Sequence, residues 1–173
     1  KRNILETFQY SKKGELVSLY MSIGYYDKAL KILREEINKE LLEGAIYRKY
    51  CSNQMVPNTI KMTDDFISQG EKVIIATCYD EELNMMKDYY GDKCVVYNGK
   101  MNQKQKDAAQ KAFMDDPNVM VFIGQVIAAG VGLTLTVSRT LIFNNIDFVP
   151  SSNRQMEDRI YRIGQTRDVN VYY

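Results

Sequence analysis

The apolar positions follow two patterns, which are continuous runs and helical spacing. From about residue 71 these two patterns alternate regularly along the chain. Short continuous apolar runs, which are typical of buried strands, occur at residues 72–79, 94–99, 119–124, 139–145 and 169–173. Segments with helical spacing lie between the first three runs, at residues 80–91 and from near Asn102 to Asp115. Asn102 and Gln105 have the spacing of a capping box, which predicts that the second of these helices begins there. The alternation predicts an α/β fold with three layers, in which a parallel β-sheet is flanked by helices.

The first sixty residues have mainly helical spacing and differ from the rest of the chain. Residues 25–53 are expected to form a helix by period and by propensity. A separate helix is expected from Thr59 to Gln69, with Gly70 ending it. The stretch TFQYS, residues 7–11, is expected to form a short strand. The sequence therefore predicts an N-terminal helical segment ahead of an α/β domain.

The stretch QMEDRIYRIGQ, residues 155–165, combines a polar and an apolar pattern. On an α-helix, Gln155, Arg159 and Arg162 share one face, because they are separated by four and by three residues. The neighbouring face is apolar and consists of Met156, Ile160 and Ile163. Guanidinium groups held rigidly on one face suit a phosphate, since each offers a planar fork of donors. Spacing alone leaves open an ordinary amphipathic helix with solvated arginines.

Composition narrows the chemistry that this chain can perform. It has 173 residues, 45% of them hydrophobic, and no apolar run long enough to cross a membrane. The formal net charge of +1 gives no global basic field, so any nucleic-acid contact needs local patches. The absence of histidine excludes Ser-His and Cys-His catalysis and His-ligated metals, and the three cysteines have no metal-binding spacing. We expect an intracellular fragment of a longer protein, with no membrane association and no metal site.

A glycine segment, AAGVGLTLT at residues 128–136, follows the third predicted strand. Gly130 and Gly132 stand near the carboxyl end of that strand, where glycines let backbone N–H groups approach a phosphate; a tight turn is the alternative. The chain contains no GxxxxGK[ST] sequence and hence no phosphate-binding loop of the Walker A type. A lobe that has arginines suited to phosphate, but no such loop of its own, can complete the phosphate site of a partner lobe.

Six ordered blocks resemble the motifs of one family: YRKYCSN, KVIIATCY, YNGKM, QVIAAGVGLTLT, IDFVPSSNRQ and QMEDRIYRIGQ, the last followed by VNVYY. The family is the SWI/SNF-like branch of superfamily-two helicases, and the resemblance is to the second RecA-like lobe of their ATPase motor. It covers about residues 45–173 and is nearest to annealing-helicase or HepA-like members. Several positions depart from the usual pattern. Gln125 and Val126 stand where the family usually has Ser and Thr, and Phe148 and Val149 where it has Trp and Asn. Asn98 replaces an Asp, and Tyr161 replaces a frequent His.

The resemblance implies a role for each matching residue. Arg162 is expected to be the arginine finger on the γ-phosphate of ATP, with Arg159 beside it and Gln155 orienting the pair. Gly130 and Gly132 are expected to couple the nucleotide state to the DNA groove. The expected contacts with the nucleic-acid backbone lie at the carboxyl ends of strands: Thr77, Asn98, Gly99, Lys100 and Gln125.

The resemblance also implies an organisation and partners. Residues 1–60 are expected to be the inter-lobe connection and helical protrusion, and residues 61–173 the RecA-like lobe. The expected cofactor is ATP, with Mg²⁺ held by the missing N-terminal RecA-like lobe of the same protein. The expected nucleic-acid partner is double-stranded or forked DNA. We expect the complete protein to be a monomer and the isolated fragment to be inactive. The expected location is intracellular, in the cytoplasm if the source is a microbe or virus and in the nucleus if it is a eukaryote.

Two other functions stay open at this point. In a non-catalytic regulatory or protein-binding α/β module, the arginine helix would dock an acidic partner. An RNA helicase lobe would share the fold, although the long spacer IDFVPSSNRQ and the terminal RIGQ disfavour it. The ordered motifs favour the DNA motor over both.

Overall fold

The computed structural model describes residues 12–129 and 133–173, apart from the side chains of residues 12, 36–38 and 40–43. Its contacts divide the chain into two compact units, Lys1–Arg48 and Lys49–Tyr173. The long helix α3 (Tyr26–Ser68) contributes residues to both units. The functional boundary expected at residue 60 stays a prediction, because compactness assigns no role to either unit. The strand expected at residues 7–11 lies outside the described residues.

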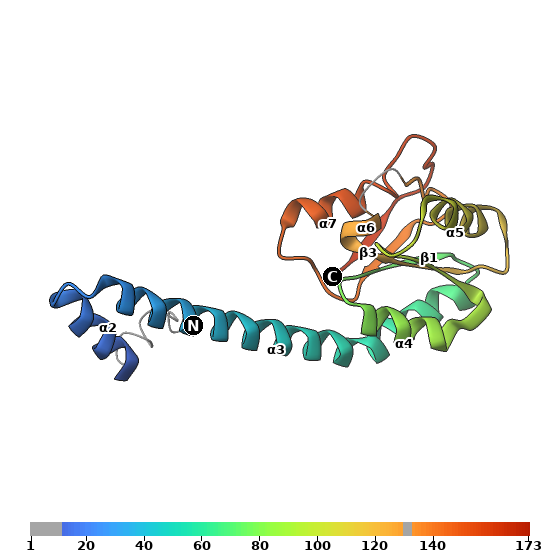
Figure 1. Cartoon of the computed structure of the whole chain (residues 1–173). Helices are drawn as coiled ribbons and strands as arrows, with labels where there is room; N and C mark the ends of the chain where they lie inside the picture. The colour runs from blue at the N-terminus through green and yellow to red at the C-terminus, as the bar shows by residue number, and fades with distance from the viewer. Residues whose placement is uncertain (1–11, 130–132) are drawn as a thin grey trace. The chain divides into compact units, whose positions relative to one another are not determined.

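A five-stranded parallel sheet forms the centre of the second unit (Figure 1). Its strands are β1 (Val73–Thr77), β2 (Cys94–Tyr97), β3 (Val121–Gln125), β4 (Thr140–Phe143) and β5 (Asn170–Tyr172). Their order across the sheet is β2-β3-β1-β4-β5, and the register pairs Val73 with both Val121 and Thr140. Every residue of β1 and β4 is buried, which requires near-continuous apolar runs. The predicted parallel sheet is therefore confirmed.

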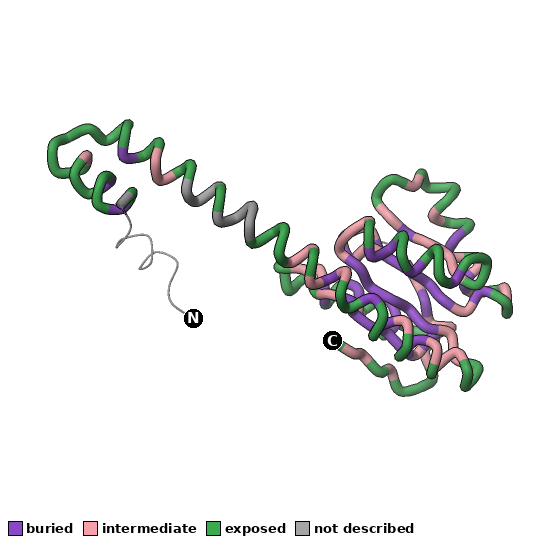
Figure 2. The backbone as a smooth tube through the Cα atoms, turned by 90° about the horizontal axis from the view of Figure 1, so that it is seen from below, coloured by how far each residue is buried: buried purple, intermediate pink, exposed green. Residues whose placement is uncertain are grey.

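Helices cover both faces of the sheet and give the predicted three layers (Figure 1). Besides α3, this unit contains α4 (Asp80–Tyr90), the 3-10 turn η1 (Gly91–Lys93), α5 (Gln103–Asp115), α6 (Val126–Ala129) and α7 (Pro150–Glu157). Ile74 and Phe122 pack with α5, α6 and α7 in one core, whereas Ile75 and Ile123 pack with α3 and α4 in the other. Figure 2 shows the buried strands between these helical layers.

The two ends of α5 are fixed by side chains. Asn102 Oδ1 accepts from the Gln105 N–H at 3.0 Å, and Gln105 Oε1 accepts from the Asn102 N–H at 2.9 Å, which confirms the predicted capping box. At the other end, Lys72 Nζ donates to the carbonyls of Phe113 and Asp116, each at 2.6 Å. A cation is favourable at a helix C-terminus, although burial lowers the pKa of Lys72. These contacts join α5 to the start of β1.

The helix α3 continues without interruption to Ser68, so the expectation of a separate helix beginning at Thr59 is wrong. Pro57 lies inside α3, where it has no N–H to donate and normally costs about 3 kcal/mol. A stripe of four residues at helical spacing is nevertheless buried: Ser52, Val56, Thr59 and Thr63. The packing of this stripe keeps the helix intact, because tertiary contacts outweigh local propensity.

The first unit contains α2 (Lys12–Ser22) and the beginning of α3. Val17 and Ala29 are buried, and the rings of Tyr20 and Tyr25 meet edge to face at 6.4 Å. The ammonium of Lys28 lies 4.8 Å from the centre of the Tyr25 ring. Most other described residues of this unit are exposed (Figure 2). None of the described helices has both the length and the apolarity of a membrane span.

Replacing Pro57 by alanine is expected to stabilise the second unit, because Pro57 is exposed and alanine adds an N–H donor inside α3. After allowance for the freer unfolded chain, the expected gain in unfolding free energy is about 2 kcal/mol. Urea denaturation of the purified chain measures this gain. The control is Asn58→Ala, at the exposed neighbouring position, with an expected change below about 0.7 kcal/mol. A loss of stability in Pro57→Ala would contradict a continuous helix here.

Candidate nucleotide and nucleic-acid site

The arginine-bearing stretch is helical only over its first part. The helix α7 ends at Glu157, so the prediction of one helical face carrying Gln155, Arg159 and Arg162 is wrong. Residues 158–165 instead form a series of tight turns, termed the arginine turn. The last of these turns is closed by a hydrogen bond from the Gln165 N–H to the Arg162 carbonyl at 2.9 Å.

The helix gives way to turns because residues 158–165 are tied to the segment 133–138. The N–H of Leu135 donates to the carbonyl of Arg159 at 3.0 Å, so this carbonyl points to that segment. Ile160 is fully buried in the core beneath α7, whereas Ile163 is fully exposed. The predicted apolar stripe therefore ends at Ile160.

The two arginines of the turn lie in different environments. Arg159 is only 9% exposed, and burial together with the neighbouring charge of Arg162 lowers its pKa. Arg162 is exposed, and its Nη1 donates to Thr134 Oγ1 at 2.9 Å. Two like charges held close together favour an anion, and guanidinium groups suit phosphate oxygens in particular.

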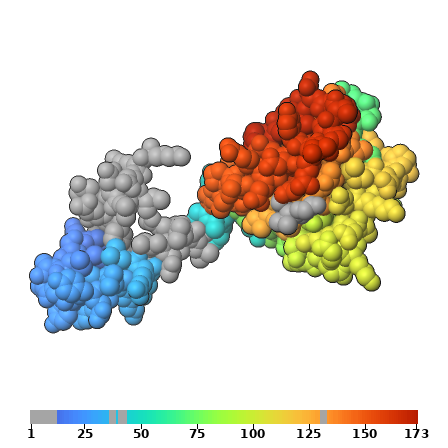
Figure 3. Space-filling model, turned by 90° about the horizontal axis from the view of Figure 1, so that it is seen from above, coloured from blue at the N-terminus to red at the C-terminus, as the bar shows by residue number. Residues whose placement is uncertain are grey.

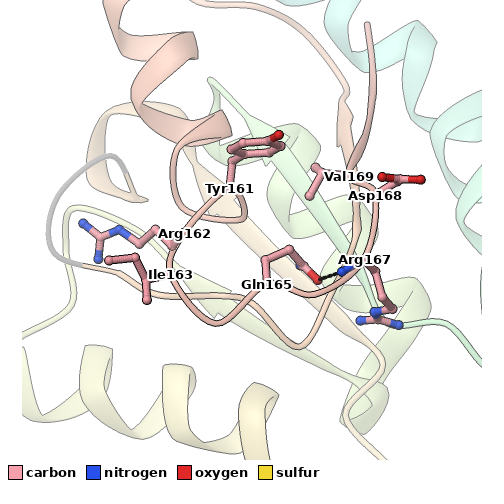
Figure 4. Close-up of a pocket in the computed structure, with 7 residues that line it drawn as sticks. All are labelled: Tyr161, Arg162, Ile163, Gln165, Arg167, Asp168 and Val169. Carbon is pink, nitrogen blue, oxygen red and sulfur yellow. Dashed lines mark hydrogen bonds between the residues drawn. The ribbon is translucent and has the colours of Figure 1, made fainter.

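Side chains hold the end of the arginine turn on the same segment. Gln165 Nε2 donates to the carbonyls of Thr136 at 3.2 Å and Ser138 at 2.8 Å. Arg167 Nη2 donates to the carbonyl of Val137 at 2.6 Å. A hollow of about 480 Å³ lies here, and Figure 4 shows the residues that line it: Tyr161, Arg162, Ile163, Gln165, Arg167, Asp168 and Val169. Figure 3 shows the face of the molecule on which the C-terminal part of the chain lies, coloured orange to red.

The other residues predicted at the nucleotide are placed differently. Gln155 is exposed on α7 and lines a separate hollow of about 300 Å³, not the one that Arg162 lines. Gly130 and Gly132 lie outside the described residues. The helix α6 precedes these two glycines in the chain, and the segment 133–138, which binds the arginine turn, follows them.

Four of the five predicted nucleic-acid contacts meet at the carboxyl edge of the sheet. A residue that the sequence pattern did not predict joins them, since Asp80 accepts from Gln125 Nε2 at 2.8 Å and from Lys100 Nζ at 2.7 Å. Gln125 Oε1 accepts from the Gly99 N–H at 3.4 Å, and Asn98 Oδ1 accepts from the Lys100 N–H at 3.0 Å. These five residues are termed the edge cluster. Asp80 opens α4 just after β1, so its position offered the same signal as the other four.

Thr77, the fifth predicted contact, takes no part in this cluster. It is the last residue of β1 and is fully buried between neighbouring strands. Its hydroxyl donates to the carbonyl of Gly124 at 3.4 Å. The prediction for Thr77 is therefore corrected, because a nucleic-acid backbone has no access to its side chain in this structure.

The turn that carries Asp80 is fixed by a fully buried carboxylate. Glu82 accepts from the backbone N–H groups of Cys78 and Tyr79, the latter at 2.7 Å. It also accepts from the side chains of Ser52 in α3 and Asn144 at the end of β4. This satisfied polar network joins α3 to the β1–α4 turn and so positions the edge cluster.

The donor groups of the site suit anions. The arginine turn offers guanidinium groups, and the edge cluster offers an ammonium, amides and backbone N–H groups. In the part of the chain that the structure describes, no three His, Cys, Asp or Glu residues are grouped so as to hold a metal ion. Phosphate groups therefore match the chemistry of both parts of the site.

A comparison with protein families matches residues 58–164 to the helicase conserved C-terminal domain. The chain belongs to this family. The matched range contains the whole edge cluster and all but the last residue of the arginine turn. The residues that carry the candidate chemistry are thus those of a helicase C-terminal domain.

Similar proteins place this helicase C-terminal domain in the SWI/SNF-like branch of superfamily two. Helicase SWR1 of Yarrowia lipolytica is 32% identical over 114 residues, covering 64% of this chain and 6% of that protein. Helicase swr1 of Schizosaccharomyces pombe is 31% identical over 115 residues, covering 65% of this chain and 9% of that protein. The chain therefore spans only a small part of these relatives.

A solved structure supports the same assignment. The crystal structure of the C-terminal part of the Fun30 ATPase domain matches with a TM-score of 0.57 and 26% identity. The match covers 62% of this chain and 35% of that chain. The predicted RecA-like α/β fold is thereby confirmed, while the finer resemblance to annealing-helicase or HepA-like members stays a prediction.

Gly124 of β3 marks a close approach of α6 and α7 to the sheet. A Cβ atom there would lie 3.0 Å from Phe122 Cε1, 3.1 Å from Ala129 Cβ and 3.6 Å from Met156 Cε. Gly124→Ala is therefore expected to lower the unfolding free energy by about 1–3 kcal/mol through overpacking, as measured by urea denaturation. Gly99→Ala is the control, because its Cβ meets nothing within 4 Å. Equal stability of the two variants would contradict this packing.

Proposed function

We propose that this chain is the second motor lobe of an ATP-dependent DNA translocase or helicase of the SWI/SNF-like type. Membership of the helicase C-terminal family supports an ATP-dependent enzyme as the complete protein. The observation that carries the proposal is the arginine turn fixed on the segment 133–138 through Leu135 and Thr134, in a chain that has no Walker A loop of its own. In this proposal the first lobe of the same protein holds ATP and Mg²⁺, and this lobe supplies the arginine fingers.

Arg162 is the proposed finger on the γ-phosphate. Its guanidinium is exposed, and the bond to Thr134 restricts the directions in which it points. A guanidinium held in place stabilises the charge that develops on the transferred phosphoryl group without reorganisation. Arg159 is buried and supports the same charge from within the turn. Gln155 is proposed to orient the nucleotide from α7.

The edge cluster is the proposed contact with the DNA backbone. It presents the Gly99 N–H, the Lys100 ammonium, and the side-chain amides of Asn98 and Gln125 on one edge of the sheet. Donors of these kinds bind phosphate oxygens and read no base edge. Backbone binding of this type supports a motor that moves along any sequence.

A continuous stretch of chain links the two parts of the site. Gln125 belongs to the edge cluster, α6 follows it directly, and the segment 133–138 binds the arginine turn. Gly130 and Gly132 lie within this stretch, and we propose that they couple the nucleotide state to the DNA contact. Coupling of this kind requires an element with two arrangements that each site prefers differently.

The proposal extends to organisation and partners. Residues 1–60 are proposed to be the inter-lobe connection and the helical protrusion, and the partner is double-stranded or forked DNA. The complete protein is proposed to act as a monomer. A nuclear location is proposed, because the named relatives are fungal helicases.

The purified chain is expected to hydrolyse no ATP, with or without duplex DNA. Its arginines act only on a nucleotide that another lobe holds in place. A phosphate-release assay at saturating ATP measures this. Sustained turnover by the chain alone would contradict the two-lobe proposal.

In the complete protein, Arg162→Ala is expected to reduce DNA-stimulated ATP hydrolysis by about 10³-fold or more, with ATP affinity changed severalfold at most. Steady-state hydrolysis and nucleotide titration measure the two quantities. Arg154→Ala is the matched control, since it removes an exposed arginine from α7 outside the arginine turn. Equal effects of the two substitutions would refute the finger assignment. Stimulation by RNA but not by DNA would replace the DNA motor with an RNA helicase.

A further inference from the structure

We propose that Asp80 is a positioning residue that holds Lys100 and Gln125 when no nucleic acid is bound, and that it limits the affinity of the edge cluster for a phosphate backbone. This inference rests on the proposed function, because it takes the edge cluster as the DNA contact. It adds a residue whose role is to compete with DNA instead of binding it.

The geometry of Asp80 carries this inference. Each of its carboxylate oxygens takes one donor, with Oδ1 accepting from Gln125 Nε2 at 2.8 Å and Oδ2 from Lys100 Nζ at 2.7 Å. The contact with Lys100 holds the pKa of Asp80 below its usual range, so the carboxylate is charged at neutral pH. One anion of the protein therefore occupies the ammonium and the amide that a phosphodiester would use.

The contact is of a kind that a phosphate can displace. The side chains of Lys100 and Asp80 are 77% and 40% exposed, and ion pairs this exposed contribute little free energy. Once Lys100 has turned to a phosphate, Asp80 remains at the first position of α4, which favours a carboxylate there. It then faces the DNA with a like charge, which lowers the affinity. A motor that steps along DNA has to release each phosphate, and Asp80 supplies a competitor for that release.

The neighbouring residue provides a matched control. Glu81 lies in the same first turn of α4 and has the same charge as Asp80. It forms an ion pair with Lys49 at 2.5 Å, and its charge acts on Lys100 less than that of Asp80 does. Glu81→Gln therefore removes the same charge at the same helix end but leaves the contacts of Asp80 in place.

The test uses the complete protein and a short DNA duplex, with binding measured by fluorescence anisotropy between about 50 and 200 mM salt. Asp80→Asn is expected to bind about three- to tenfold more tightly at the lowest salt, with a log–log salt slope steeper by up to about one. Asp80→Glu is expected to stay near the original affinity. Glu81→Gln is expected to change affinity by less than about twofold. In ATPase assays, the larger change in Asp80→Asn is expected in the DNA concentration for half-maximal stimulation, not in the maximal rate.

Lys100→Ala separates the possible failures. If Lys100→Ala weakens DNA binding but Asp80→Asn tightens it no more than Glu81→Gln does, the role of Asp80 is overturned and the proposed DNA contact stands. If neither Lys100→Ala nor Asp80→Asn changes DNA binding, the edge cluster is not the DNA contact, and both proposals fail at this site. Melting temperatures of all variants verify that each one is folded.

Discussion

The arrangement of the candidate nucleotide site depends on one backbone hydrogen bond, from the Leu135 N–H to the Arg159 carbonyl at 3.0 Å. This bond ties the residues after α7 to the segment 133–138, which follows the glycines. It brings Arg162 within 2.9 Å of the Thr134 hydroxyl and leaves Ile160 as the buried anchor beneath the turn. A helix continuing past Glu157 would carry these side chains in other directions. The site is thus made by tertiary contact between two turns, not by one regular element.

Positive charge is handled in two different ways in this lobe. In the arginine turn, Arg159 and Arg162 are close enough for the charge of one to lower the pKa of the other. In the edge cluster, Lys100 is already paired with Asp80. The first arrangement gains from the arrival of an anion, whereas the second exchanges one anion for another. In the proposed motor, this difference suits a nucleotide that is held during chemistry and a DNA backbone that is released after each step.

The parts of the fold that could be predicted from the sequence are those that local chemistry determines. The buried strands follow from continuous apolar runs, and the start of α5 follows from the spacing of Asn102 and Gln105. The path of α3 through Pro57 could not be predicted, because its buried stripe is completed by residues distant in sequence, such as Asn144 bonded to Thr59. The end of α7 depends in the same way on Leu135.

The candidate site shows the same division between local and long-range information. Family motifs predicted Arg159, Arg162, Lys100 and Gln125 as site residues. The structure places Arg162 against Thr134, and Lys100 and Gln125 against Asp80. The motifs did not include Asp80, although it directly follows the β1–α4 turn, and its bonds to both Gln125 and Lys100 appear only when the ends of three strands meet at one edge of the sheet. The central claim is that this lobe stabilises the transition state of ATP hydrolysis. In the complete protein, the most direct test compares the binding of ADP–aluminium fluoride and of a non-hydrolysable ATP analogue with and without Arg162→Ala. We predict a loss of about 10³-fold for the transition-state mimic and little change for the analogue, whereas unchanged affinity for the mimic would contradict the claim.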